Sequence, residues 1–269
     1  MLVASGFAAG GAQAQNYPDH PIRLIVGTAP GGTQDGTARM VSKEVENLLG
    51  QPIVVDNRGG ANGIIGYDLV AKSAPDGYTL LHTAVAFAIN ATVYKKLPFD
   101  VSKDFIPVTT IAVGQGALIV VHASVPAHSA KELVELAKQK QLTYSSPGIG
   151  NGMHLIIKAG RLRALAYSGV KRLDVMPDMP LIAEAGYPGF HMDSGWHGWF
   201  APAKTPQSII NKLYASVQKA IATPKMKEFF ASIGYDPGGL SPEQFRKTFE
   251  ADKKRWGEIA RVAKITADE

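Results

Sequence analysis

The stretch IRLIVGTAPGGTQDGTARMVSKEVENLL, residues 22–49, decides the fold. Its first five residues, Ile22 to Val26, form an apolar run rich in β-branched side chains, which is typical of a buried strand. Gly50, followed by Pro52, predicts the end of a helix. Before that end, apolar residues recur at helical spacing at Ala38, Val41, Val45 and Leu48. The stretch is therefore a strand-to-helix junction.

The turn between this strand and this helix, residues 28–35, is suited to an anion. Thr33 is the expected N-cap, and the paired glycines Gly31 and Gly32 let backbone N–H groups come close to a guest. A helix start also gathers unpaired donors and the positive end of the helix dipole. The turn alone does not decide between an anion site and an ordinary capped helix start.

Two more units of the same kind follow. Residues 52–56 and 78–83 are predicted strands, and the alternation of strands and helices implies a parallel sheet with right-handed crossovers. In such sheets, ligands gather where loops leave the carboxyl ends of the strands. We therefore expect the loops 29–35, 58–63 and 83–87 to lie along one rim.

The rest of the chain continues the α/β pattern. Further strands are predicted over residues 106–113, 117–121, 142–146 and 162–167. The strand at 142–146 leads into a second glycine-rich loop, residues 147–152, which is similar to the first. Helices are predicted to open at Ser129, at Thr205-Pro206, at Pro224 and at the capping box Ser241-Pro242-Glu243-Gln244. The helix after the capping box should turn four residues inward: Phe245, Phe249, Trp256 and Ile259.

Composition limits the function classes only in part. The chain has 269 residues, 45% hydrophobic and 19% charged, which suits one large domain or two of moderate size. A formal net charge of +5 favours anionic partners mildly, but no basic run is interleaved with aromatics, so nucleic-acid binding is not predicted. The absence of cysteine excludes disulfides, thiol catalysis and thiolate metal sites.

Residues 1–14 resemble the rear part of a signal peptide. They are small and apolar as far as Gly11, and Ala12-Gln13-Ala14 matches the A-x-A pattern of a cleavage site, although no Lys or Arg precedes the apolar core. We expect a signal peptide remnant here and an exported mature chain from Gln15; the alternative is a plain small-residue tail. No later apolar run approaches the roughly 20 residues that cross a bilayer.

Catalytic motifs are missing from the sequence. It contains neither G-x-S-x-G nor G-x-x-x-x-G-K-[ST], and the seven histidines are dispersed without metal-ligand spacing. No cofactor or metal is therefore expected. His154, just after the second glycine loop, is a candidate donor to a bound anion. The segment Trp196-His197-Gly198-Trp199-Phe200 either walls a ligand pocket or packs a crossover between two lobes.

A series of short motifs points to one family. They are, in chain order, YP at 17–18 with PIRLIV at 21–26, GGTQD at 31–35, NR at 57–58 with GANG at 60–63, APDGYTLL at 74–81, AIN at 88–90, KDFIPV at 103–108, AEAGYPGF at 183–190 and APAKTP at 201–206. In this order they resemble the Bug-type periplasmic solute receptors of tripartite tricarboxylate transporters, from about Tyr17 to the C-terminus.

This resemblance implies an α/β fold of the type II periplasmic-binding class, a two-lobed clamshell with a mostly parallel sheet in each lobe. The first lobe would hold residues 15–113 and 197–269, and the second would hold residues 114–196. After residue 155 the chain departs from the family pattern, because residues 153–156 run straight into the segment 157–165. A block of several tens of residues is thus expected to be absent there, either deleted or omitted.

The resemblance also implies a site in which a carboxylate is held between the lobes by a loop from each. The first-lobe residues would be Pro30, Gly31, Gly32, Thr33, Gln34 and Asp35, with Thr83 and Ala84 lining the cleft. The second-lobe residues would be Ser145, Ser146, Gly148, Gly150, Asn151, Gly152 and His154.

The predicted function is that of a non-enzymatic, monomeric periplasmic receptor that captures a small organic carboxylate and delivers it to the membrane subunits of a tripartite tricarboxylate transporter. The competing hypothesis is a hydrolase-like α/β enzyme that acts on a small carboxylate through Ser145 or Ser146. A third hypothesis is a ligand-free adaptor for a sensor protein.

Overall fold

The computed structural model describes residues 17–140, 142, 162–173, 176–190, 192–193, 195–263 and 265–267. The expected signal peptide remnant and the second glycine-rich loop both lie outside these residues. Within them, no helix is long and apolar enough to span a membrane.

A six-stranded sheet forms the main body, in the order β2-β1-β3-β7-β4-β8. Its strands are β1 (Ile22–Val26), β2 (Ile53–Asn57), β3 (Thr79–Ala84), β4 (Phe105–Gly114), β7 (Trp196–Pro202) and β8 (Tyr235–Pro237). The β2-β1-β3 part is parallel, as the alternating sequence predicts. The whole sheet, however, is mixed rather than mostly parallel: β7 runs antiparallel to both β3 and β4, and β4 runs antiparallel to β8.

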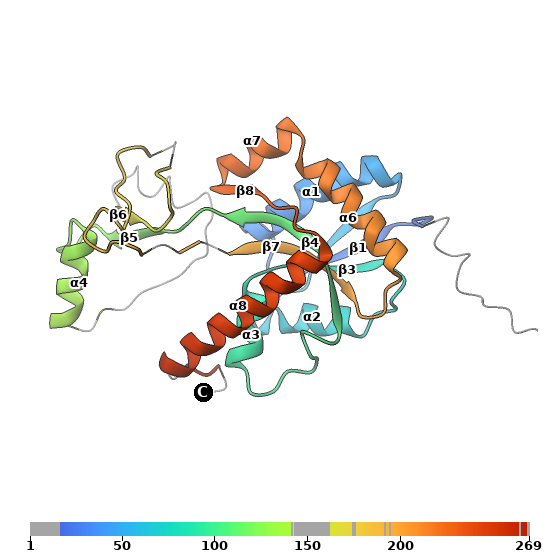
Figure 1. Ribbon diagram of the computed structural model, residues 1–269, viewed down its shortest axis with the longest axis horizontal. Helices are drawn as coiled ribbons and strands as arrows, with labels where there is room; N and C mark the ends of the chain where they lie inside the picture. Colours follow the sequence, from blue (N-terminus) through green and yellow to red (C-terminus); the bar gives the residue numbers. More distant parts are fainter. Residues whose placement is uncertain are drawn as a thin grey trace, which may run out of the picture.

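Helices cover both faces of this sheet (Figure 1). On one face lie α1 (Thr33–Leu49), α6 (Gln207–Ile221) and α7 (Pro224–Ser232), over a core that contains Leu24, Val41 and Leu213. On the other face lie α2 (Ile64–Ala71), α3 (Ala86–Val93) and α8 (Pro242–Ala263), over a second core rich in aromatic residues. A short 3₁₀ turn, η1 (Ala61–Gly63), precedes α2.

A second, smaller sheet lies apart from the main body (Figure 1). In the described residues it consists of β5 (Leu118–His122) and β6 (Leu162–Tyr167), paired antiparallel, with α4 (Ala130–Gln139) nearby. The molecule is therefore two-lobed. Where one lobe passes into the other, and whether a block is absent after residue 155, stay predictions.

The segments that connect the two sheets lie against one another. The backbone N–H of Gly114 donates to the carbonyl of Gly195 at 2.7 Å, and that of Ala117 donates to the Ser168 hydroxyl at 2.8 Å. At this crossing Gly116 packs against Gly169 so closely that a Cβ on Gly116 would lie 2.5 Å from the Gly169 nitrogen. At these two glycines the crossing brings backbone against backbone, with the Ser168 hydroxyl and the Tyr167 ring beside them.

The local sequence signals are mostly confirmed. Gly50 ends α1 in the left-handed conformation, with φ of 73°. The Ser129 hydroxyl accepts the Glu132 N–H at the start of α4. At the capping box, Ser241 and Gln244 bond reciprocally, at 3.0 and 3.3 Å.

Two local predictions are wrong. The N-cap of α1 is Gly32, not Thr33, because the extended backbone ends at Gly32 and Thr33 is already helical. Ile259 is 44% exposed, because the last part of α8 extends beyond the sheet that buries Phe245 and Phe249 (Figure 1).

Candidate ligand-binding site

The loops that follow β1, β2 and β3 lie at one edge of the sheet, because these three strands are adjacent and parallel. The first two loops are joined by a bond from the Asn57 side-chain amide to the Thr28 carbonyl, at 3.1 Å. The Asn90 side chain, on α3, donates to the carbonyl of Asn62 in the second loop at 2.9 Å. The expected rim is therefore present, and a helix begins just after each loop.

The first loop is the most exposed part of this rim. Residues 29–32 are exposed, and no atom lies within 4 Å of where a Cβ on Gly31 or Gly32 would be. Gly31 has a φ of +91°, a conformation that side chains other than glycine adopt rarely. Its N–H donates to Oδ2 of Asp35 at 3.0 Å. The glycines thus bend the chain sharply into α1 and leave its first turn accessible to solvent.

Asp35 braces this turn from within. Its buried carboxylate lies 2.9 Å from Arg39, whose guanidinium also donates to Asn57. Burial opposes ionisation of Asp35, but hydrogen bonds from Arg39 and from the Gly31 N–H outweigh it and hold the pKa of this carboxyl below its ordinary value. Asp35 is therefore a carboxylate at pH 7; its Oδ2 accepts from the Gly31 N–H in the loop, and its Oδ1 forms the ion pair with Arg39 on α1.

Two other polar atoms at the loop are buried without a partner among the described residues: Oγ1 of Thr28 and Oε1 of Gln34. A buried polar group that makes no hydrogen bond costs about 1–3 kcal/mol. A hydroxyl can both donate and accept, and an amide side chain offers either its oxygen or its nitrogen. Of these two atoms, the Thr28 hydroxyl can donate to an anion, whereas Oε1 of Gln34 can only accept a hydrogen bond.

Beneath the loop lies a buried polar network centred on Thr37, in the second turn of α1. The Thr37 hydroxyl oxygen lies 3.1 Å from Nε2 of His82 and 2.8 Å from Nδ1 of His197. Nδ1 of His82 in turn lies 3.1 Å from the indole nitrogen of Trp199. His82 is on β3, and His197 and Trp199 are on β7. The network therefore ties α1 to two central strands.

The proton positions in this network follow from its donors. An indole N–H can only donate, so Nδ1 of His82 accepts from Trp199, and the neutral imidazole carries its proton on Nε2. That N–H donates to Thr37. Burial lowers the pKa of His197 to about 4 and lowers that of His82 well below its ordinary value, with the neighbouring His197 adding to the effect on His82. Both histidines are neutral at pH 7.

The third loop is supported by a tyrosine. Thr83 is fully buried and its hydroxyl donates to the Tyr67 hydroxyl at 2.9 Å. The Tyr67 ring lies beneath Gly27 and Gly63, where a Cβ on either glycine would lie 2.5–2.6 Å from ring atoms. Burial raises the pKa of Tyr67 to about 12, so it stays protonated. Thr83 thus supports the rim from below.

The structure brings one half of the predicted site together. Pro30, Gly31, Gly32, Thr33, Gln34 and Asp35 form the first loop and the start of α1, and Thr83 and Ala84 end the neighbouring β3. The predicted second-lobe residues, Ser145, Ser146, Gly148, Gly150, Asn151, Gly152 and His154, lie outside the described residues. All these site assignments stay predictions.

The aromatic segment at 196–200 is strand β7, and it packs the interior. Trp196, Trp199 and Phe200 are each at most 4% exposed, and Trp196 donates to Asp252 on α8 at 2.8 Å. Of the two interpretations open from the sequence, core packing is the one that fits. The sequence did not single out Thr37, His82 or Tyr67, because their partners are distant in the chain.

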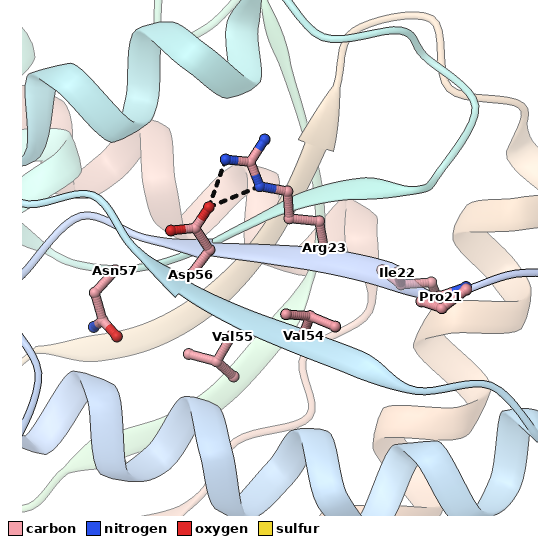
Figure 2. Close-up of a pocket in the computed structure, with 7 residues that line it drawn as sticks. All are labelled: Pro21, Ile22, Arg23, Val54, Val55, Asp56 and Asn57. Atoms are coloured by element: carbon pink, nitrogen blue, oxygen red, sulfur yellow. Dashed lines mark hydrogen bonds and ion pairs between the residues drawn. The ribbon is translucent and has the colours of Figure 1, made fainter.

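Cavities are found elsewhere on the described surface. A shallow hollow of about 500 Å³ lies along β1 and β2, where the Arg23 guanidinium donates to Asp56 at 2.8 Å on one face of the strands while Val55 and Asn57 lie on the other (Figure 2). A second, of about 250 Å³, lies at the crossing between the sheets. Among the described residues, no group of three or more His, Asp or Glu side chains is placed to hold a metal.

The chain matches one protein family along most of its length. Residues 37–158 and 156–265 match the family described as "Tripartite tricarboxylate transporter family receptor" (TctC). A UPF0065 protein from the tcbD-tcbE intergenic region of Pseudomonas sp. (strain P51) is 30% identical over 301 residues, covering 94% of this chain and 89% of that protein. Protein BugT of Bordetella pertussis is 29% identical over 311 residues, covering 97% of this chain and 94% of that protein.

Solved structures agree with this match. A structure described as a periplasmic transporter superimposes with a TM-score of 0.82 at 32% identity, covering 94% of this chain and all of that one. The periplasmic binding protein BugD gives a TM-score of 0.81 at 26% identity, covering 93% and 99%. Rpa4515 of R. palustris, solved with adipate, gives 0.83 at 28% identity, covering 93% and 99%.

Proposed function

Because this chain belongs to the tripartite tricarboxylate transporter family of receptors, we propose that its ligand is a small organic carboxylate bound at the loop after β1. As a member of this family it is a substrate-binding receptor of the periplasmic type, not an enzyme. The structural neighbour Rpa4515, solved with adipate, supports a carboxylate as the ligand of this chain too.

The observation that carries the proposal is the chemistry of the loop at residues 28–34. It is exposed, it turns on glycines, and it leads into the N-terminus of a 17-residue helix. Within it, the Thr28 hydroxyl has no partner among the described residues and can donate a hydrogen bond to an acceptor. Backbone N–H groups of a first helical turn have no acceptor within the helix, so they suit a carboxylate.

The contacts of this loop alone are too weak to hold a ligand. Hydrogen bonds to a charged group contribute about 1.5–3 kcal/mol each. The helix dipole adds about 0.3–1 kcal/mol for a negative charge in its first turn. Three such bonds with the dipole sum to about 5–10 kcal/mol, and the cost of association, about 4–15 kcal/mol, cancels most or all of this. A second set of contacts is therefore needed.

We place that second set in the other lobe, on the loop from Ser145 to His154. We propose that neither lobe buries the ligand alone and that rotation about the crossing completes the site. The closed, loaded receptor would then be recognised by the membrane subunits of a transporter. The periplasmic neighbours support export of this chain, and we further propose that it acts as a monomer.

Binding is tested by thermal unfolding of the purified protein against di-, tri- and aromatic carboxylates, adipate and malate among them. A ligand present at 100 times its Kd stabilises the folded state by about 2.7 kcal/mol. We expect at least one carboxylate to raise Tm without being consumed. Turnover of the ligand would support the enzyme hypothesis instead, and a panel without any shift would contradict the proposal.

The loop itself is tested by Gln34→Met. Methionine keeps the length of the side chain and removes the buried amide, so stability should be unchanged or slightly higher while the Kd for the carboxylate rises about tenfold, the equivalent of 1.4 kcal/mol. Gln218→Met is the matched control, because Gln218 on α6 also has an unpartnered buried amide atom and lies away from the loop. Equal Kd values for both variants would place the ligand elsewhere.

A further inference from the structure

The network beneath the loop meets the start of α1 at one hydroxyl. The Thr37 hydroxyl lies 2.9 Å from the Thr33 carbonyl and 3.0 Å from the Gln34 carbonyl, which are both in the first turn of α1. Two buried histidines reach the same hydroxyl from the sheet. One side chain therefore connects the sheet to the two peptide groups at the start of the helix.

Because the peptide group is planar, this contact also affects the direction of the N–H groups in the first turn of α1. The carbonyl of Thr33 and the N–H of Gln34 belong to one planar trans peptide group and point in opposite directions. The same holds for the carbonyl of Gln34 and the N–H of Asp35. A hydroxyl that fixes both carbonyls from the interior therefore fixes the direction in which both N–H groups point at the start of the helix.

The donor at Trp199 fixes the direction of the hydrogen bonds from Trp199 through His82 to Thr37. Thr37 has one hydrogen and two lone pairs. His82 donates through Nε2 to one lone pair, and the Thr37 hydroxyl donates its hydrogen to the carbonyls of Thr33 and Gln34. Trp199 is the origin of this order, because its indole N–H prevents a proton on Nδ1 of His82.

We propose that Thr37, His82 and Trp199 are positioning residues for the ligand: Trp199 holds His82 in the Nε2–H tautomer, His82 donates to Thr37, and Thr37 aims the first-turn N–H groups of α1 at the carboxylate. This inference rests on the proposed function for the identity of the ligand, but not for the orientation of the N–H groups. The lowered pKa of His82 agrees with it, because a second proton would place two N–H groups against each other.

The test compares Trp199→Phe, Thr37→Val and the double variant, with adipate as the probe in titration calorimetry. Each single change should weaken adipate binding about tenfold, the equivalent of 1.4 kcal/mol. Because both act through one hydroxyl, the double variant should bind about as weakly as the weaker single variant, not about 100-fold more weakly than the wild type.

Two controls match these changes. Thr109→Val removes a buried threonine hydroxyl that donates to the Leu240 carbonyl at 2.8 Å, on β4. Trp256→Phe removes an indole N–H that has no partner among the described residues, on α8. Both controls should bind adipate within about twofold of the wild type, even where Thr109→Val lowers Tm, because neither removed group is hydrogen-bonded to Thr37, His82 or Trp199.

A readout without ligand separates this inference from the proposed function. In ¹⁵N NMR spectra, His82 should be the Nε2–H tautomer in the wild type and a mixture in Trp199→Phe, and the amide signals of Gln34 and Asp35 should shift in both test variants but in neither control. Unmoved amide signals, or effects on adipate binding that multiply in the double variant, would overturn the inference. If the wild type binds no carboxylate while the amide signals move, the proposed function fails and the positioning role stands.

Discussion

Single residues decide how this protein responds to acid, because His82 and His197 are neutral in the folded state. Their pKa values lie below 6.5, for His197 at about 4, so the unfolded chain binds protons that the folded chain refuses. The stability they contribute is complete above pH 6.5 and is lost as the pH falls toward the folded pKa.

The loss of stability in acid can be measured as the slope of the unfolding free energy against pH. The free energy of unfolding should fall by about 1.4 kcal/mol per pH unit for each buried histidine, between about pH 6.5 and about pH 5. Urea unfolding of the wild type and of His197→Gln over this range should show the slope reduced to roughly half in the variant. His128→Gln, at an exposed position, is the control and should keep the wild-type slope. Parallel curves for all three proteins would contradict the assignment.

At this scale the sequence predicted residues whose partners are close in the chain and missed those whose partners are distant. Ser129 bonds three residues ahead, and so does Ser241, so the capping patterns were visible. Thr37, by contrast, meets His82 across 45 positions and His197 across 160. The sequence around an isolated histidine does not reveal such a partner, because only the order of strands in the folded sheet brings Thr37, His82 and His197 together.

Among the elements, the junction of β1 with α1 depends on the backbone freedom of one glycine. A Cβ on Gly31 would meet no atom within 4 Å, yet φ at this residue is +91°. Gly31→Ala should therefore lower the free energy of unfolding by about 1–2 kcal/mol through backbone strain alone. Urea unfolding measures the change.

Gly36 provides the contrast within the same helix. It is helical, and a Cβ there also meets nothing within 4 Å. Gly36→Ala should raise the free energy of unfolding by about 0.5–1 kcal/mol, because alanine loses less backbone entropy in a helix than glycine does. If Gly31→Ala lowers the free energy of unfolding and Gly36→Ala raises it, the loop ends and the helix begins between these two residues. Changes of the same sign in both variants would contradict this boundary.

The elements with strong periodicity were predicted almost to the residue, β1 and β6 among them. The strand β7 was not predicted, because Gly198 interrupts its aromatic run. The structure explains that glycine: a Cβ there would lie 2.4 Å from the ring of Phe245 on α8. The last part of α8 was predicted as buried because periodicity reports which side of a helix is apolar, not how far the neighbouring sheet extends.

For the whole molecule, the two-lobed form implies a change of shape on binding. Small-angle X-ray scattering should show a smaller radius of gyration when a carboxylate from the binding panel is added, since closure brings the lobes together. The same protein with a sugar that gives no thermal shift is the control. An unchanged radius with a ligand that does bind would show that the site is complete within one lobe.

The fold at this scale came from the resemblance and not from periodicity. Alternating strands and helices predicted a parallel sheet, which describes only β2-β1-β3; the antiparallel strands enter because the chain leaves for the second lobe and returns as β7. The family matches in two ranges that meet at residues 156–158, and the aligned stretch with the Pseudomonas relative, 301 residues, is longer than this chain of 269. That relative therefore carries residues without a counterpart here.

The meeting of Gly116 with Gly169 has a consequence for selectivity. Gly116 and Gly169 have no side-chain rotamers to rearrange when the joint turns, so this contact itself favours neither the open nor the closed shape strongly. The equilibrium between the open and the closed shape then depends on the ligand that contacts both lobes. A ligand that is too short to contact both lobes does not stabilise the closed shape. Such a receptor would therefore select its ligand by length as well as by charge.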